Sequence, residues 1–236
     1  MKKVLVITIA IMLLSAHHAA HAALGIDFSS SVAASGLVEN GGPSSFGAAT
    51  GYTTVGWAFT AETDLSLTRL GLYDADRDKR HTEQHLVGLW SAAGELLASV
   101  MINEDPTFVH SPETSPNGAL FHFVNTSSPV LLSAGQTYFV GATLYAGIND
   151  FDTFAAFNND EASIFINPNL TYLGNRYAIN ATNALLFPQS TVSDYDYTIG
   201  ANIDVSPVPV PGAAWLLGSG LIGLAGLRRK KKAAIA

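Results

Sequence analysis

Short apolar runs recur along this chain between turn-forming residues, and this spacing is the feature that most limits its possible folds. Helical periodicity is scarce, whereas segments of strand-like composition follow one another closely. These segments are 56–62, 65–74, 85–102, 119–125, 129–145, 163–166, 176–180, 183–187 and 196–205. Eight or more strands at this spacing predict an all-β fold, a jelly-roll-like β-sandwich.

In the segment 65–74, the spacing of the leucines changes halfway along. These leucines are Leu65, Leu67, Leu70 and Leu72. They occupy odd positions first and even positions afterwards, so a regular strand would point them to opposite faces. A β-bulge near Thr68 and Arg69 restores a common face, and the sequence therefore predicts one there.

Glycine-containing turns and longer loops are predicted between the strands. Ala93-Gly94 is expected to close one hairpin, and residues 133–136 another. The segment 103–118 is expected to be a crossover loop between two sheets. The Gly- and Ser-rich region 25–52 is expected to be an extended or loop-rich lead-in.

The first 22 residues have the composition of a secretory signal peptide. Lys2 and Lys3 precede a 13-residue apolar run, which is shorter than the ~20 residues that span a bilayer. Small residues then place a cleavage site between Ala22 and Ala23. The chain is therefore expected to be exported, with an uncleaved N-terminal anchor as the alternative.

The C-terminal segment is expected to cross a membrane. Residues 208–227 carry no charge, and 20 residues at about 1.5 Å each can cross a ~30 Å hydrocarbon core. We expect a helix over about 212–227, because prolines keep the approach to it extended. The basic residues after it would stay cytoplasmic and stop transfer: Arg228, Arg229, Lys230, Lys231 and Lys232.

This tail, "VPVPGAAWLLGSGLIGLAGLRRKKK", resembles the PEP-CTERM sorting signal of Gram-negative bacteria. The matching proline motif is Val208, Pro209, Val210 and Pro211, with valine where the namesake motif has glutamate, as in the family's "VPLPAAAWL" variant. The resemblance covers 207–236 and implies processing by an exosortase-type membrane enzyme. It also implies an exopolysaccharide or biofilm setting, an inner-membrane-anchored precursor, and a final place at the cell surface or outside the cell.

The segment between the two ends, 23–206, is expected to be one β-sandwich ectodomain. Stretches 55–74, 85–99 and 129–142 resemble an uncharacterised β-sandwich domain common in such exported proteins, which implies a fold and no activity. The segment holds all 19 acidic residues and five basic ones, a formal net charge of −14. This charge repels nucleic acid and anionic lipid, and it attracts divalent cations. The chain has no cysteine, so an apolar core must hold the domain together.

The clearest local candidate for a metal site is the loop "DADRDKRH", 74–81. Asp74, Asp76 and Asp78 alternate as at the start of a calcium loop. An EF-hand is excluded, because Lys79 and His85 occupy the positions of its glycine and its bidentate glutamate. Calcium is thus the one cofactor to consider, and a solvated loop neutralised by its own basic residues is the alternative that we favour.

Other patterns argue against an enzyme. "HTEQH", 81–85, lacks the glutamate directly after the first histidine that a zinc protease needs, and we interpret it as a solvated hairpin. Nucleophile-elbow and phosphate-binding glycine motifs are absent from the sequence. Four aromatic residues lie in strand-like segments and could form either a sugar platform or part of the core: Trp57, Trp90, Tyr73 and Tyr138.

The sequence therefore favours a non-enzymatic, exported surface or matrix protein. Its expected partners are an exosortase-type enzyme, the inner membrane transiently, and exopolysaccharide or surface glycans. The alternative is a carbohydrate-active enzyme or a lectin-like module that carries the same sorting signal. A third hypothesis is a purely structural matrix component.

Overall fold

The computed structural model describes residues 23–28, 52–74, 81, 84–103, 111–114, 119–145, 155–157, 164–180, 182, 184–191 and 196–208. Every regular element in these ranges is a β-strand, so the predicted all-β class is confirmed. Within the same ranges, no helix is long and apolar enough to cross a membrane. The predicted signal peptide and the predicted tail helix lie outside the described residues.

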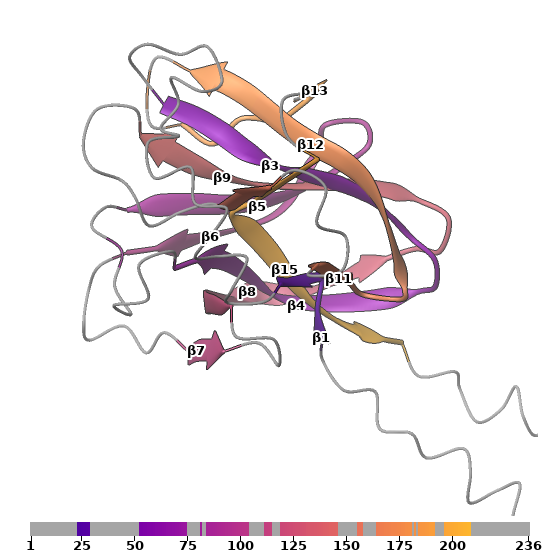
Figure 1. The fold of residues 1–236 in the computed structure, drawn as a ribbon. Helices are drawn as coiled ribbons and strands as arrows, with labels where there is room; N and C mark the ends of the chain where they lie inside the picture. The colour runs from indigo at the N-terminus through magenta and orange to yellow at the C-terminus, as the bar shows by residue number, and fades with distance from the viewer. Residues whose placement is uncertain are drawn as a thin grey trace, which may run out of the picture.

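Two antiparallel sheets form a β-sandwich (Figure 1). The five-stranded sheet runs in the order β1 (Ala23–Leu24), β15 (Ala201–Pro207), β4 (Leu65–Tyr73), β8 (Leu120–Leu132) and β7 (Ser111–Thr114). The six-stranded sheet runs in the order β13 (Ser190–Thr191), β12 (Leu170–Asn180), β3 (Tyr52–Ala61), β9 (Thr137–Tyr145), β5 (His85–Ser91) and β6 (Leu96–Ile102).

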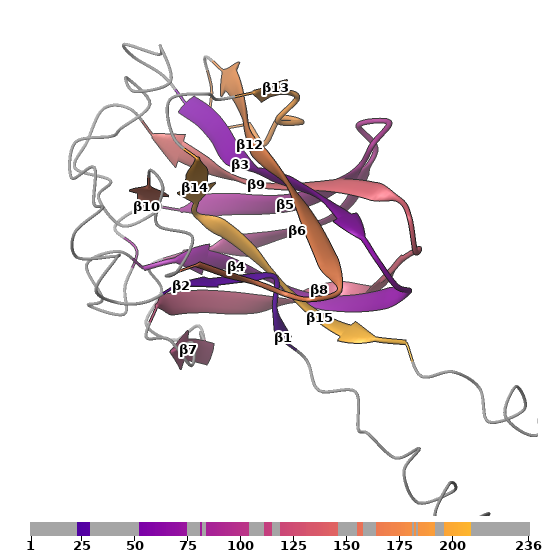
Figure 2. The ribbon, with the colours of Figure 1, turned by 45° about the vertical axis from the view of Figure 1, so that its right-hand side comes forward.

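Two short ribbons add to the sandwich (Figure 2). They are β2 (Ile26–Phe28) with β11 (Ile164–Ile166), and β10 (Ala155–Phe157) with β14 (Tyr197–Ile199). Phe28 of β2 packs edge-on against Tyr73 of β4 and Phe121 of β8, with ring centroids 4.9 and 5.7 Å apart. Strand β2 thus covers the outer face of the five-stranded sheet around Tyr73 and Phe121, both of which are buried.

The apolar core between the two sheets includes an indole that also makes a polar contact across them. Trp57 of β3 is fully buried, and its Nε1–H donates to the carbonyl oxygen of Ala201 in β15 at 2.8 Å. A buried carbonyl without a donor would lower the stability by about 1–3 kcal/mol. The bond therefore fixes the relative position of β3 and β15 as well as filling the core.

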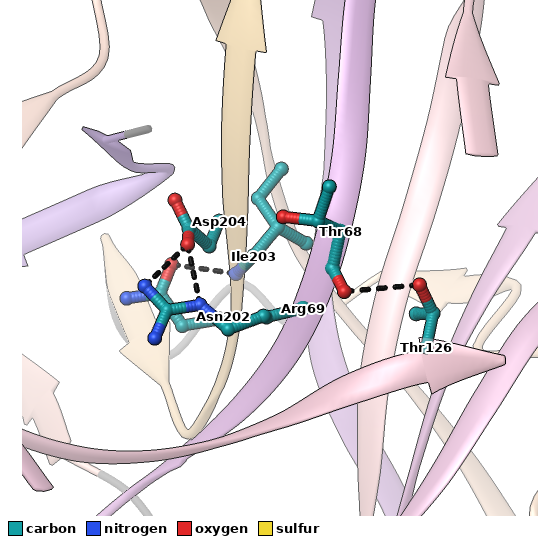
Figure 3. A network of polar contacts seen from close by, with 6 residues as sticks. All are labelled: Thr68, Arg69, Thr126, Asn202, Ile203 and Asp204. Atoms are coloured by element: carbon teal, nitrogen blue, oxygen red, sulfur yellow. Dashed lines mark hydrogen bonds and ion pairs between the residues drawn. The ribbon is translucent and has the colours of Figure 1, made fainter. Parts of the chain in front are cut away.

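The predicted β-bulge is confirmed at Thr68. The pairing of β4 shifts register against both neighbours, between Leu67 and Arg69 on the β8 side and at the same point on the β15 side. The bulged carbonyl of Thr68 accepts a hydrogen bond from the Thr126 hydroxyl at 3.0 Å (Figure 3). All four leucines of β4 are consequently buried in the core: Leu65, Leu67, Leu70 and Leu72.

The bulge also turns Arg69 towards the outer face, where it meets a buried carboxylate. Arg69 Nε lies 2.6 Å from Oδ2 of Asp204 on β15, and its Nη2 lies 2.5 Å from the same oxygen (Figure 3). The Asp204 side chain is 2% exposed. A carboxylate at this depth needs a hydrogen-bonded cation, so the bulge and the ion pair depend on each other.

Both predicted glycine turns are confirmed, and two loop and strand assignments need correction. Gly94 and Gly135 have positive φ angles of 81° and 75° in the turns before β6 and β9.

The segment 103–118 does connect the two sheets, but it contains strand β7, which the loop prediction missed. The strand predicted at 183–187 is wrong, because its described residues from Ala184 onward have no regular structure. They follow β12 as a covering segment, and Leu186 N donates to the Thr54 hydroxyl.

We expect Arg69→Met to lower the free energy of unfolding by about 3 kcal/mol, because it leaves the Asp204 carboxylate buried without its guanidinium. The double variant Arg69→Met/Asp204→Asn should recover part of this loss, since a neutral amide needs no counter-ion. Urea denaturation at neutral pH measures both effects.

Arg176→Met is the matched control. Arg176 is partly buried, lies over the Phe139 ring at 5.7 Å, and donates to a carbonyl. Its removal should cost about 1 kcal/mol. Equal losses in the two single variants, or a double variant no more stable than Arg69→Met, would contradict the assigned role of the ion pair.

Candidate functional site

Four ionisable side chains gather at one end of the core between the sheets. They come from the residue after β4, from the link between β4 and β5, from the start of β5, and from β8: Asp74, His81, His85 and His122. All four are at most 1% exposed. Because buried ionisable groups are costly, this cluster is the best candidate for a functional site among the described residues.

Asp74 and His122 form the best-defined contact of the cluster. His122 lies opposite Leu72 in the β4–β8 ladder, so both side chains point between the sheets, and Asp74 follows two residues after Leu72 on the same face. His122 Nε2 lies 3.0 Å from Asp74 Oδ2. With the carboxylate as acceptor, Nε2 carries the proton, and in the neutral ring Nδ1 is then the nitrogen with the lone pair.

His85 is oriented from the other sheet. Its Nδ1 lies 2.7 Å from the main-chain carbonyl oxygen of Thr143 in β9, and a carbonyl can only accept. Nδ1 therefore donates, and in the neutral ring the lone pair is on Nε2. The Thr143 hydroxyl accepts from Leu86 N at 2.9 Å, which fixes the start of β5 beside the same residue.

His81 lies between the two oriented rings. Its ring centroid is 4.7 Å from that of His122 and 5.7 Å from that of His85, with edge-on geometry in both pairs. The interpretation of "HTEQH" as a solvated hairpin is thus wrong for its two histidines, both of which are buried. The absence of a zinc-protease helix stands, because His85 begins a strand.

The cluster consists of three imidazole rings and one carboxylate, all of them buried. Two rings from opposite sheets are held by hydrogen bonds at one nitrogen each, and a third ring contacts both. In the described part of the chain, no group of three His, Asp or Glu residues could hold a metal ion. The arrangement is one of oriented histidines rather than of carboxylate oxygens.

Of the three calcium candidates, the structure describes only Asp74. Asp74 is buried and engaged by His122, so it does not belong to a freely solvated loop. Asp76 and Asp78 lie outside the described residues, and the calcium hypothesis stays a prediction. The part that sequence reasoning missed is His122, because a single histidine within an apolar strand has no local motif.

The four aromatic candidates belong to the core. Trp57, Trp90, Tyr73 and Tyr138 are between 0% and 6% exposed. A sugar platform made of these residues is therefore wrong, since stacking needs an accessible ring face.

A second polar cluster lies on β12, where a bulge at Gly174, with φ of 94°, shifts the register against β3. The Oδ1 atom of Asn175 accepts from the Tyr172 hydroxyl and from Thr198 N. Burial, and then the neighbouring Tyr197, raises the pKa of Tyr172 far above its usual value. This tyrosine is thereby kept neutral and serves the structure at this bulge.

The expected processing sites flank the described fold. Ala23 begins β1, and Val208 donates its N–H to the Asp64 carbonyl at 3.0 Å just after β15. Ala22, the rest of the proline motif (Pro209, Val210 and Pro211) and the basic cluster Arg228–Lys232 lie outside the described residues.

Comparison with known proteins gives one finding. A family with the description "Domain of unknown function (DUF4082)" matches residues 41–199, which include the histidine cluster and most of both sheets. No curated protein matches the chain.

Long-range ¹H–¹⁵N correlation NMR of the neutral imidazoles tests the cluster directly. We expect His85 as the Nδ1–H tautomer and His122 as the Nε2–H tautomer, because Thr143 and Asp74 supply the acceptors. Asp74→Leu should remove the tautomer preference of His122 and leave that of His85 unchanged. An Nε2–H ring at His85 in the unaltered protein would contradict the geometry.

Proposed function

The chain belongs to the DUF4082 family, and from this premise we propose that it is an exported cell-surface or extracellular-matrix protein. Its β-sandwich would act as a non-enzymatic interaction module, delivered by a signal peptide and an exosortase-type sorting signal. The setting that fits such a signal is an exopolysaccharide or biofilm matrix.

The pairing of the first and last strands supports this proposal. Ala23 lies opposite Val205 and Leu24 opposite Asp204, so the chain enters and leaves the sandwich at the same edge of one sheet. A cleavage site before Ala23 and a sorting motif beginning at Val208 would thus both sit next to this edge. Removal of either segment would leave in place every strand that the structure describes.

The chemistry of the tail supports the same route. An uncharged segment followed by five basic residues fits a membrane-anchored precursor with its N-terminal domain exported and its C-terminus cytoplasmic. A net charge of −14 on 23–206 disfavours binding of that domain to anionic lipid or nucleic acid. Contact with the inner membrane would therefore go through the tail alone.

The jelly-roll-like connectivity is part of this proposal. Strands β3 and β9 pair in one sheet. The strand that follows β3 and the strand that precedes β9 are β4 and β8, and these two pair in the other sheet. Such nested antiparallel pairs, whose connections pass from sheet to sheet, are typical of jelly rolls. Many binding modules use this architecture, but the fold alone does not assign a ligand.

The rival proposal is a carbohydrate-active enzyme or lectin-like module on the same tag. The burial of Trp57, Trp90, Tyr73 and Tyr138 removes the aromatic groups that first suggested sugar stacking. A glycan site would need other residues.

Mass spectrometry of the protein from its native host tests the sorting route. We expect the mature chain to begin at Ala23 and to lack the uncharged segment and the basic residues. Pro209→Ala/Pro211→Ala should keep the tail, because it alters the motif that the processing enzyme reads. Pro207→Ala, a matched control in the last residue of β15, should be processed normally. A mature surface protein that retains residues beyond Pro211 would refute processing.

Incubation with exopolysaccharide from the host separates the binding module from the enzyme. We expect saturable retention of the protein without release of reducing sugar. Release of reducing sugar that is abolished by one carboxylate substitution would establish the enzyme instead.

A further inference from the structure

We propose that two copies of this chain associate through their β6 strands, which pair antiparallel about a two-fold axis at Ser99. Strand β6 is the last strand of the six-stranded sheet, and its only ladder among the described residues is with β5 (Figure 1). Its other edge therefore presents main-chain donors and acceptors to a further strand. The proposal names a second copy of the chain as the partner and does not depend on the sorting route.

The strands at the other sheet edges have features that prevent the addition of a strand, and β6 lacks them. Strands β1 and β13 have two residues each, and β7 has four residues with a proline among them. Strand β6 has seven residues, "LLASVMI", without a charge or a proline. Because short strands, prolines and charged side chains protect sheet edges, β6 is the edge that is suited to pairing.

A hydrogen bond of β5 shows which residues of β6 point to the outer edge. Leu86 N donates to the Thr143 hydroxyl of β9, away from β6. Main-chain groups alternate in direction along a strand, so those of Val87 point to β6, where they face Val100. On β6, Ser99 and Met101 therefore direct their N–H and C=O groups away from β5 and towards a second copy.

The sequence of β6 is complementary to itself when Ser99 lies opposite Ser99 of the second copy. Every cross-strand pair in this register is apolar or joins two hydroxyls, and pairs of these kinds stabilise a sheet. Like charges do not meet at any position of the strand. The pairs are Ser99–Ser99, Leu97–Met101, Ala98–Val100 and Leu96–Ile102.

Exposure and charge both favour a second copy as the partner. Leu96 is 50% exposed and Met101 is 46% exposed, so pairing would remove apolar surface from water. The segment 23–206 has a formal net charge of −14, and two copies therefore repel each other over most of their surface. The uncharged β6 edge is where they can approach with little repulsion. A two-fold interface uses this edge once in each copy and is closed, which limits the assembly to a dimer.

The first test compares Ser99→Lys with Ser127→Lys in the full-length chain in mild detergent. Both serines are exposed, and Ser127 lies on β8 of the other sheet. Sedimentation equilibrium should give a monomer–dimer equilibrium for the unaltered chain. Ser99→Lys should lower the association constant at least about tenfold, because it places two lysines opposite each other at the two-fold axis. Ser127→Lys should leave it unchanged.

Single cysteines test the register, since the chain has no cysteine of its own. Hydrogen-bonded cross-strand partners have Cα atoms about 5.5 Å apart, which is within the range of a disulfide. Ser99→Cys should therefore form a covalent dimer on mild oxidation. Met101→Cys is the matched control on the same strand, and it should not cross-link, because its two copies would lie roughly 14 Å apart.

A monomer at every protein concentration would overturn the proposal. A dimer that Ser99→Lys does not weaken would also overturn it, because association would then go through the uncharged tail or another surface. Equal cross-linking of Ser99→Cys and Met101→Cys would contradict the register and with it the proposal. Circular dichroism verifies the fold of each variant, and the cysteine comparison decides the question if Ser99→Lys fails to fold.

Discussion

The bulge at Thr68 is the constraint on which the rest of the sandwich depends. Strand β4 pairs with both β15 and β8, and a regular β4 would send Leu70 and Leu72 to the face opposite Leu65. One extra residue brings all the leucines of β4 into the core and places Arg69 on the outer face. There the guanidinium neutralises buried Asp204, which pins the register of the neighbouring strand. The bulge at Thr68 thus determines both the burial of the leucines and the formation of the Arg69–Asp204 ion pair.

The histidine cluster follows from this register. After the bulge, Leu72 faces the core, and its partner across the ladder is His122. Two residues beyond Leu72, the same face carries Asp74 at the end of the strand, within hydrogen-bond distance of that imidazole. A shift of one residue in β4 would turn Asp74 away from the core and separate it from His122. The register of β4 that buries its leucines therefore also brings Asp74 and His122 together.

The features that the sequence predicted correctly are those that depend on residues close together in the chain. The bulge was visible in the spacing of four leucines, and the hairpins in glycines whose φ angles are positive. The histidine cluster joins positions 74, 81, 85 and 122 through the sheet order, which no local pattern contains. The cover that β2 provides at one end of the outer face could not be predicted for the same reason, because it depends on the contacts of Phe28 with Tyr73 and Phe121. The segment 183–187 has the composition of a strand, yet its described residues lie across a face of the six-stranded sheet, where Phe187 contacts Phe139 of β9 and Trp90 of β5.

A domain without cysteine needs some link between its sheets other than a disulfide. Part of that link is the indole of Trp57, which fills the core and donates to β15. The histidine cluster offers a second link at one end, since His85 belongs to the six-stranded sheet and His122 to the five-stranded sheet.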